Sequence, residues 1–361
     1  QELVDTADTF GAWCNAAGGI LGRKITLNKR DSKLMEAAPR MVEACQTDFM
    51  LVGNGAALDD TTVTAREGCG LPQIATFTVG VRSGTAKLSL LAVPNSQYQS
   101  HLSGVFLKLK AVDPSVLGAF GELNSQLPSL NGAGKRNAQA AVDAGYTQVY
   151  YEETPAMVDN WRTFAENIKA KGVQVLSIED TPENGASLLK AMNDVGYFPK
   201  YFVFEANFYN PKLIQEAGEA LAKTTVLING DIVPFELAGP DFPATAEYMA
   251  LLKATTGQSP RALGINAMSA WLLWAKSATA CGSNLTRACV MEQASKVKGW
   301  TAGGLHSPTD PADSRGSNTL CFLTLQATPA GFVLRKDITQ PNQGIFNCDP
   351  ANQPTVTGYQ P

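Results

Sequence analysis

The chain has 361 residues, enough for two domains that each bury a core of their own. Its hydrophobic share of 44% and charged share of 17% are those of a folded chain, which excludes general disorder. The formal net charge of -4, without any cluster of Lys or Arg, argues against nucleic acid as a partner, and no apolar run reaches the ~20 residues of a membrane span.

The first third of the chain alternates helical and apolar segments. Helices are expected at residues 6–17, 36–45, 61–68 and 96–109, and strands at residues 24–28, 49–52 and 73–77. This order is typical of parallel strands joined by crossover helices. It predicts one α/β lobe.

A second series of the same kind begins after residues 112–114. Strands are expected at residues 115–120, 148–151, 173–178, 201–204 and 225–228, and helices at residues 135–144, 160–171, 186–195 and 211–222. Helices at 244–255 and 264–280 then precede a hairpin of residues 317–326 and 331–335. The tail from residue 340 is expected to run extended over the surface, tied down by Cys348. Two series predict two lobes.

Seven cysteines and two histidines favour disulfides over a zinc site, and no CxxC pair occurs. Pairing of sequence neighbours leaves Cys14 alone and gives Cys45–Cys69, Cys281–Cys289 and Cys321–Cys348. Other pairings stay open, and so does a cytosolic protein with reduced thiols. Structural disulfides would place the chain in an oxidising compartment outside the cytoplasm.

Residues that carry enzymatic chemistry are scarce. His101, in a helix-like stretch, and His306, in a loop, are the candidate general bases, and no GxSxG motif accompanies either. Residues 131–136 read NGAGKR, which lacks the spacing and the hydroxyl residue of a P-loop. The pair Asp59 and Asp60 are sequence neighbours, which point apart on a strand. No catalytic residue, metal site or cofactor is predicted.

One segment identifies a family. Residues 15–25 read NAAGGILGRKI, a helix end and turn. The segment closely resembles the N-x-x-GGI-x-GRK-I motif of type I periplasmic binding proteins in the branched-chain amino acid transport family, similar to leucine-isoleucine-valine-binding proteins. Weaker similarity follows in the family's order to about residue 335, and a disulfide between Cys45 and Cys69 is typical of that family.

The resemblance implies two doubly wound parallel-sheet lobes joined by a three-segment hinge, near residues 112–113, 230–233 and 307–313. The lobes would comprise residues 1–112 with 234–308, and residues 113–233 with 309–361. The family also begins with a strand and a loop that precede the first helix and carry part of the ligand site. That strand, an export signal and the partner of Cys14 are expected upstream of Gln1.

In the first lobe, the resemblance places ligand contacts in two loops after strands. The first loop holds Asn54, Gly55, Ala56 and Ala57, and the helix start that follows it favours an anionic group. The family often has a serine where this chain has Ala56 and Ala57. The second loop holds Thr76, Phe77 and Thr78, and Arg82 beyond it is either a carboxylate partner or a solvated surface charge.

In the second lobe, Asp231 falls on the position that binds an ammonium group in the family's amino-acid binders, although an Asp there also caps turns. The loop of residues 121–126, with Asn124, and the segment 205–209, with Asn207 and Phe208, should complete that wall. Phe208 is a candidate for stacking on the ligand, or else a packing residue.

The resemblance therefore predicts a non-enzymatic, extracytoplasmic solute-binding protein of an ABC importer. It would capture a small carboxylate-bearing ligand with an apolar or aromatic body in the interlobe cleft and deliver it to a membrane permease. A monomer is expected, periplasmic or anchored as a bacterial cell-surface lipoprotein. The alternatives are a branched-chain or other amino acid as the ligand, a ligand-sensing receptor of the same fold, and a Rossmann-type enzyme.

Overall fold

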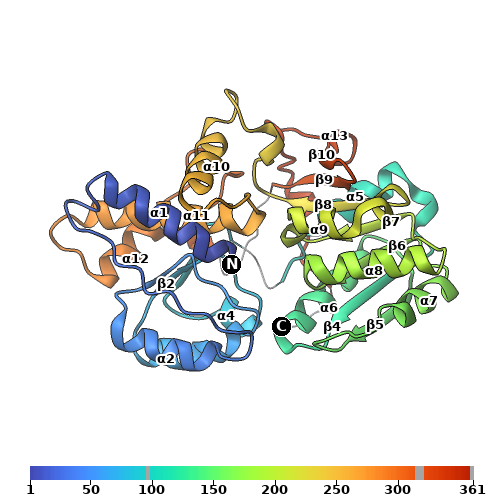
Figure 1. Ribbon diagram of the computed structural model, residues 1–361, viewed down its shortest axis with the longest axis horizontal. Helices are drawn as coiled ribbons and strands as arrows, with labels where there is room; N and C mark the ends of the chain where they lie inside the picture. The colour runs from blue at the N-terminus through green and yellow to red at the C-terminus, as the bar shows by residue number, and fades with distance from the viewer. Residues whose placement is uncertain (95–97, 314–320, 358–361) are drawn as a thin grey trace. The chain divides into compact units, whose positions relative to one another are not determined.

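The computed structural model describes residues 1–94, 98–313 and 321–357. The chain forms two compact units (Figure 1). Unit 1 comprises Gln1–Gln97 and Ile232–Thr319, and unit 2 comprises Tyr98–Asp231 and Leu320–Pro361. The chain therefore first passes from unit 1 to unit 2 at Tyr98, earlier than the expected boundary at residue 112.

The helix α5 (Ser103–Val112) explains this difference, because it belongs to the core of unit 2. Its Phe106 is fully buried and meets the rings of Phe120 and Tyr146 edge-on, with centroids 5.6 Å away in both cases. The helix also begins later than expected. His101 consequently lies in a turn before α5 rather than within a helix.

Unit 1 has a small parallel sheet in the order β1-β2-β3, formed by Leu51–Val52, Gln73–Ala75 and Ser89–Leu91. Its helices are α1 (Glu2–Ala16), α2 (Ala37–Thr47), α3 (Val63–Gly68), α4 (Val81–Gly84), α10 (Pro243–Thr256), α11 (Ala262–Cys281) and α12 (Arg287–Ser295). Phe10 of α1 stacks on Trp271 of α11 at 5.2 Å. The sequence missed β3, α4 and α12.

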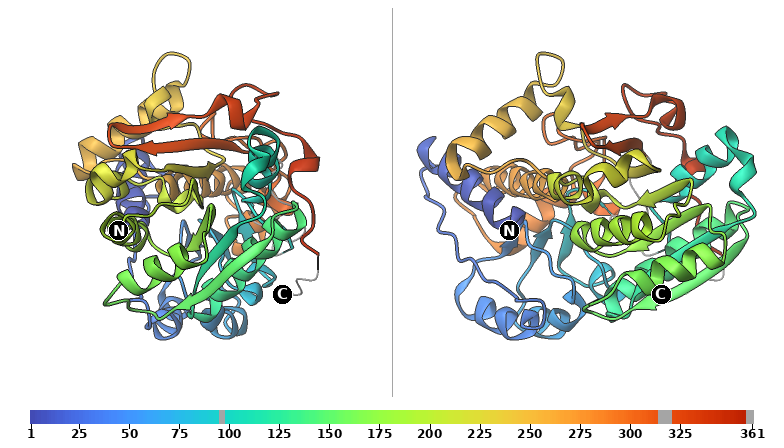
Figure 2. Two further views of the ribbon diagram at one scale, coloured as in Figure 1. Left: turned by 90° about the vertical axis from the view of Figure 1, so that its right-hand side faces the viewer. Right: turned by 45° about the vertical axis from the view of Figure 1, so that its right-hand side comes forward.

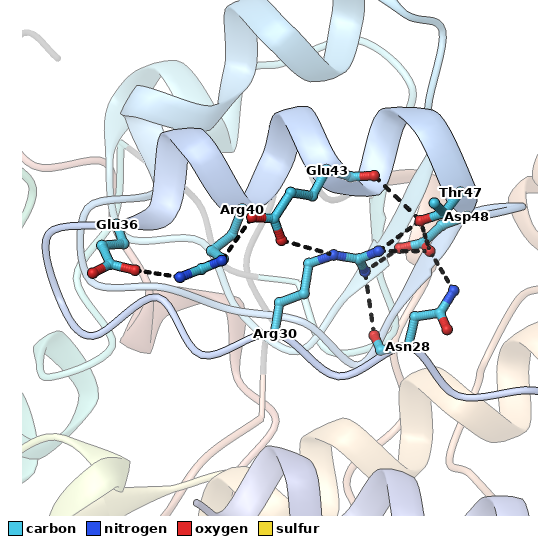
Figure 3. A network of polar contacts seen from close by, with 7 residues as sticks. All are labelled: Asn28, Arg30, Glu36, Arg40, Glu43, Thr47 and Asp48. Atoms are coloured by element: carbon cyan, nitrogen blue, oxygen red, sulfur yellow. Dashed lines mark hydrogen bonds and ion pairs between the residues drawn. The ribbon is translucent and has the colours of Figure 1, made fainter.

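The strand expected at residues 24–28 is absent from the described structure, and this prediction was wrong. The segment has no described strand beside it. Instead, the Asn15 side chain accepts from the Ile25 N–H at 2.7 Å and donates to its carbonyl at 2.9 Å. Further along, Arg30 donates to Asp48 at 2.6 Å and to Thr47 at 2.6 Å, next to the end of α2 (Figure 3). Side chains therefore hold this segment where a strand ladder was expected.

The turn that follows α1 matches the motif that identified the family. Gly18 and Gly19 have φ angles of 104° and 76°, a region that favours glycine. A Cβ atom on Gly19 would lie 2.1 Å from the Arg23 carbonyl oxygen. The two glycines thus end α1 and let the chain turn sharply into the segment held by Asn15.

Unit 2 is built on a seven-stranded sheet in the order β10-β9-β8-β7-β6-β4-β5, with β8, β7, β6, β4 and β5 parallel and β9–β10 an antiparallel hairpin at one edge (Figures 1 and 2). The strands are Phe120–Ser125 (β4), Gln148–Thr154 (β5), Val175–Glu179 (β6), Tyr201–Phe204 (β7), Thr225–Gly230 (β8), Leu323–Thr328 (β9) and Gly331–Leu334 (β10). Besides α5, the helices are α6 (Pro128–Asp143), α7 (Arg162–Ala170), α8 (Pro182–Asp194), α9 (Pro211–Ala217) and α13 (Lys336–Thr339). The first strand of the hairpin was expected from residue 317, which lies outside the described residues.

One strand of unit 2 is displaced from its expected position. Residues 115–120 were expected as a strand, but the strand β4 begins at Phe120 and the preceding residues form a short 3₁₀ turn (Pro114–Val116). The Asp113 side chain, which accepts from the Ser115 N–H, caps that turn. Residues 121–125 are therefore strand and not the loop that the sequence predicted.

The disulfides are Cys45–Cys69, Cys281–Cys289 and Cys321–Cys348, so pairing of sequence neighbours is confirmed. Cys14 is a free, buried thiol. In the described part of the chain, no helix is both long and apolar enough to cross a bilayer.

Candidate functional site

Unit 1 contains a cavity of about 1170 Å³. One wall is β1 with the residues around it, and another is the extended segment of residues 23–32. Trp271 and Trp274 line it from α11, and the indole Nε1 of each has no hydrogen-bond partner in the described structure. Of the predicted ligand residues, the cavity is lined by Asn54, Gly55, Ala56, Ala57 and Phe77.

The loop after β1 approaches its neighbours closely. Asn54 donates through Nδ2 to Gln73 Oε1 at 3.1 Å, while its own Oδ1 has no partner among the described residues. A Cβ atom on Gly53 would lie 2.7 Å from Trp271 Nε1, and one on Gly55 would lie 2.6 Å from the Phe77 ring. Glycine is needed at both positions for this packing. The two predicted loops of unit 1 therefore touch through Gly55 and Phe77.

The loop after β2 is fixed by two carboxylates that the sequence analysis discounted. Asp59 accepts from the backbone N–H groups of Val79 and Gly80, both at 2.9 Å, and Asp60 accepts from Ser83 N–H at 2.7 Å. Burial raises the pKa of Asp59 to about 6, opposed by those two backbone hydrogen bonds. The pair therefore has a structural role in holding the loop after β2.

The remaining predicted residues of unit 1 are placed differently. Thr76 and Thr78 are 1% and 4% exposed, so their hydroxyls face the interior. Arg82 donates to Thr64 at 2.6 Å on the exposed surface, which agrees with the solvated alternative. Phe77 is only partly buried and supplies the apolar surface expected of this loop.

Unit 2 gathers carboxylates at the carboxyl ends of three adjacent strands. Glu179 is the last residue of β6, Glu205 follows β7 directly, and Asp231 follows β8 directly. Parallel neighbours end at the same edge of a sheet, which is where ligands bind in open α/β folds. Adjacent strand ends are therefore all acidic at the expected ligand edge.

These side chains share the face of the sheet that α5 and α6 cover. Val175, Val203 and Leu227 pack in the buried core with residues of α5 and α6. Side chains two positions apart in a strand point to the same side. Along each strand, the side chains on this face are therefore apolar in the core and carboxylate at the strand end.

A single amide connects two of the carboxylates. Asn137 of α6 donates through Nδ2 to Glu179 Oε2 at 3.2 Å and to Glu205 Oε1 at 3.1 Å. Its own Oδ1 accepts from Ser100 Oγ at 2.6 Å. The imidazole of His101 lies 4.0 Å from Glu205 Oε2. The amide orients the two carboxylates without neutralising either.

The pKa values of these carboxylates are raised by their surroundings. Burial, and then the charge of Glu205, raises the pKa of Glu179 to about 8, although Arg136 opposes the rise. Burial also raises the pKa of Asp231, while His101 opposes that rise. Carboxylates are thus held where their charged forms are disfavoured, a condition common at functional sites.

The other predicted residues of unit 2 make contacts within the unit, and their role in ligand binding stays a prediction. Asn124 is fully buried in β4 and donates to the Asn131 carbonyl at 2.8 Å. Asn207 donates to the Asp180 carbonyl at 2.9 Å, which ties the segments after β6 and β7 together. Phe208 is fully buried with its ring 4.2 Å from that of Phe204, so its placement matches the packing alternative.

Glu179 was not among the predicted ligand residues, and Glu205 was included only as the first residue of the segment 205–209, although a pattern was present. Glu179 ends β6, and Glu205 and Asp231 directly follow β7 and β8, in the segments VLSIE, YFVFE and VLINGD. An acid after each of three parallel strands predicts a shared acidic edge. The strand expected at residues 173–178 ends one residue before Glu179, whereas the expected and observed ends of β7 agree.

The sequence of the chain matches the family model described as periplasmic binding protein over residues 1–330. The chain belongs to the periplasmic binding protein family. Members of this family bind small molecules outside the cytoplasm. No curated protein matches this periplasmic binding protein in sequence.

Solved structures share its type I fold at low sequence identity. A fatty acid ABC transporter substrate-binding protein from Thermomonospora curvata has a TM-score of 0.76 and 16% identity, covering 92% of this chain and 86% of that one. The leucine binding protein LivK from Thermotoga maritima has a TM-score of 0.75 and 14% identity, with 91% and 92% covered. LivJ from Streptococcus pneumoniae, in complex with isoleucine, has a TM-score of 0.72 and 15% identity, with 92% and 94% covered.

Within the described residues of this periplasmic binding protein, no group of three or more His, Cys, Asp or Glu is arranged to hold a metal ion.

Proposed function

We propose that this periplasmic binding protein is the extracytoplasmic substrate-binding component of an ABC importer. It captures a small molecule without altering it and delivers it to a membrane permease. The observation that carries the proposal is the family match together with polar strand ends at the ligand edge of unit 2. The bacterial periplasm or cell surface is the proposed location, and a monomer the proposed state.

The ligand class follows from the loops of unit 1. The loop of residues 54–57 contains no hydroxyl side chain, and it meets the partly buried ring of Phe77. An apolar body would lie on that ring, while the N–H groups at the start of the following helical turn (Asp59–Thr62) are near enough in the chain to receive a carboxylate. The proposed ligand therefore has an apolar or aromatic part and a carboxylate end. Neighbours of this fold include binders of leucine, isoleucine and fatty acid.

A thermal-shift screen tests this function. Amino acids, aromatic acids and short fatty acids are compared, because a ligand that binds only the folded state raises Tm by mass action. At least one small molecule should raise Tm, and mass spectrometry should recover it unchanged. A ligand that is chemically converted, or a bound nicotinamide, would replace this proposal with an enzyme.

The ligand class has its own control. Phe77→Ala should weaken binding of an aromatic or aliphatic ligand several-fold, whereas Trp13→Ala, which removes an exposed ring of α1 that does not line the cavity, should leave affinity unchanged. Equal effects of both variants would remove Phe77 from the site.

A ligand-sensing receptor of the same fold is the second candidate. Light scattering and co-purification separate the two, because an importer component should stay monomeric with ligand and bind a permease. Ligand-dependent dimerisation without a permease partner would favour the receptor.

A further inference from the structure

We propose that Trp271 of the helix α11 is a positioning residue for the loop of residues 54–57, and that it sets ligand affinity through its contact with Gly53. The inference rests on the proposed function, because that loop is the proposed ligand contact of unit 1. Trp271 acts on the residue where the chain enters the loop, and the ligand contacts themselves are made by the loop.

The indole of Trp271 is held in one orientation by its neighbours. It stacks on the ring of the fully buried Phe10, with the centroids 5.2 Å apart and the planes inclined by 22°. The ring of Trp274 meets it nearly at right angles, with the centroids 5.7 Å apart. Only 7% of Trp271 is exposed, and a ring packed in this way cannot change rotamer without displacing its neighbours. The indole is therefore a fixed support.

Gly53, the residue after β1, lies against the edge of this indole. A Cβ atom on Gly53 would be 2.7 Å from Trp271 Nε1 and 3.0 Å from Trp271 Cδ1, so no side chain fits between them. Because Nε1 has no hydrogen-bond partner among the described residues, the two residues meet by shape alone. The φ angle of Gly53 is 63°, in the left-handed region that favours glycine. The chain thus turns out of β1 directly on the indole edge.

Backbone hydrogen bonds to the neighbouring strand carry this placement into the loop. The Gly53 N–H donates to the Ile74 carbonyl at 2.9 Å, and the Asn54 carbonyl accepts from the Thr76 N–H at 2.8 Å. The chain is therefore held by β2 and the residue after it, and is supported by the indole. Groups that bind a ligand must be held to within about 0.5 Å of their working positions. Loss of the indole should weaken binding even though the ligand loses no contact of its own.

Isothermal titration calorimetry with phenylacetate, hexanoate and L-leucine tests the effect on affinity. Trp271→Leu removes the indole edge beside Gly53 and should raise the Kd of each probe that binds by about tenfold or more. Trp274→Leu is the matched control, because it removes a ring that is 9% exposed and lies on the same helix, and it should change Kd by less than about threefold. Trp271→Phe keeps a flat ring at the contact and should bind like the natural protein. Equal losses in the two leucine variants would overturn the proposal.

A double-mutant cycle measures the contact between the two residues. Gly53→Ala alone should raise Kd by about tenfold or more, because the added Cβ would be 2.7 Å from Trp271 Nε1. In the Trp271→Leu background the same Cβ has space, so the double variant should lose about fivefold less affinity than the product of the single losses. A loss equal to that product would show that the residues act independently and would contradict the proposal. If Trp271→Leu does not fold by circular dichroism, Trp271→Met, with a flexible side chain, takes its place.

Amide hydrogen exchange without ligand separates this inference from the function on which it rests. In Trp271→Leu the amides of Gly53 and Thr76 should exchange about tenfold faster, whereas the amide of Gln73, which donates to the Leu88 carbonyl, should keep its rate. Unchanged exchange at Gly53 and Thr76 would overturn the positioning role whatever the affinities. If none of the three probes binds the folded natural protein, the proposed ligand class fails, while the exchange rates still decide the positioning role.

Discussion

Units 1 and 2 combine helices and parallel strands in similar ways, yet they differ in how completely they are packed. In unit 2, an open seven-stranded sheet packs against a core that includes the buried residues Phe106, Phe120 and Tyr146. Unit 1 has three strands and a cavity of about 1170 Å³ beside β1. In unit 2 the sheet is therefore covered by a packed core, whereas in unit 1 the strand β1 and the loop of residues 54–57 border a cavity.

The largest effect is expected for the stability of unit 2, and alanine substitution of one phenylalanine in each unit measures the difference in packing. Phe106→Ala removes a fully buried ring from the packed core of unit 2 and should lower the free energy of unfolding by about 3–5 kcal/mol. Phe77→Ala removes a ring that lines the cavity of unit 1 and should cost about 1 kcal/mol. Chemical denaturation followed by circular dichroism measures both. Equal losses would mean that the two units are packed alike.

The next largest effect concerns the protonation of Glu179 in unit 2. Because the pKa of Glu179 is raised to about 8, the folded state holds a proton that the unfolded state has already lost near neutral pH. The free energy of unfolding should therefore fall by about 1–2 kcal/mol as pH rises from 6.5 to 8.5. Burial lowers the pKa of His306 from 6.5 to about 4, so this group raises stability with pH mainly below this window, opposite in sign to Glu179.

Glu179→Gln is the matched control for that pH dependence. It should flatten the decline and raise stability at pH 8.5, because it removes the group that must ionise in the folded state. A decline of the same slope in this variant would assign the effect to other groups. If the Glu179→Gln variant is more stable than the natural protein but binds the ligand more weakly, Glu179 acts as a binding residue.

The smallest effect concerns the loop of unit 1 that follows β2. Asp59→Asn removes one of the two acceptors that hold Val79 and Gly80 and should lower the free energy of unfolding by about 1 kcal/mol. Asp8→Asn, in an exposed ion pair with Lys29, should cost less than about 0.5 kcal/mol. If the two variants are indistinguishable, Asp59 does not fix the loop.

Local sequence patterns predicted much of the fold, and the wrong strand predictions have physical causes. Strand β7 was predicted to the residue, because an apolar run flanked by turns has few alternatives. The segment of residues 24–28 has the composition of a strand, but a strand exists only if another backbone pairs with it. Here Asn15 takes the backbone groups of Ile25, which no periodicity reveals.

The candidate site was less predictable than the fold. The loop of residues 54–57 and Asp231 came from resemblance to a family, and they remain predictions. Glu179 was missed, and Glu205 was predicted only as part of its segment, because the importance of both depends on strand order, which makes β6, β7 and β8 neighbours. Phe208 and Asn124 looked available in the sequence, but tertiary packing against Phe204 and bonding to Asn131 bury them.

Hydrogen–deuterium exchange with and without a ligand that raises Tm tests the central claim most directly. The account predicts slower exchange at the strand ends near residues 179–181, 205–207 and 229–231 and in the loops of residues 54–57 and 76–80. Exchange in the hairpin β9–β10 should not change. Protection confined to that hairpin, or absent from all of these strand ends and loops, would contradict the account.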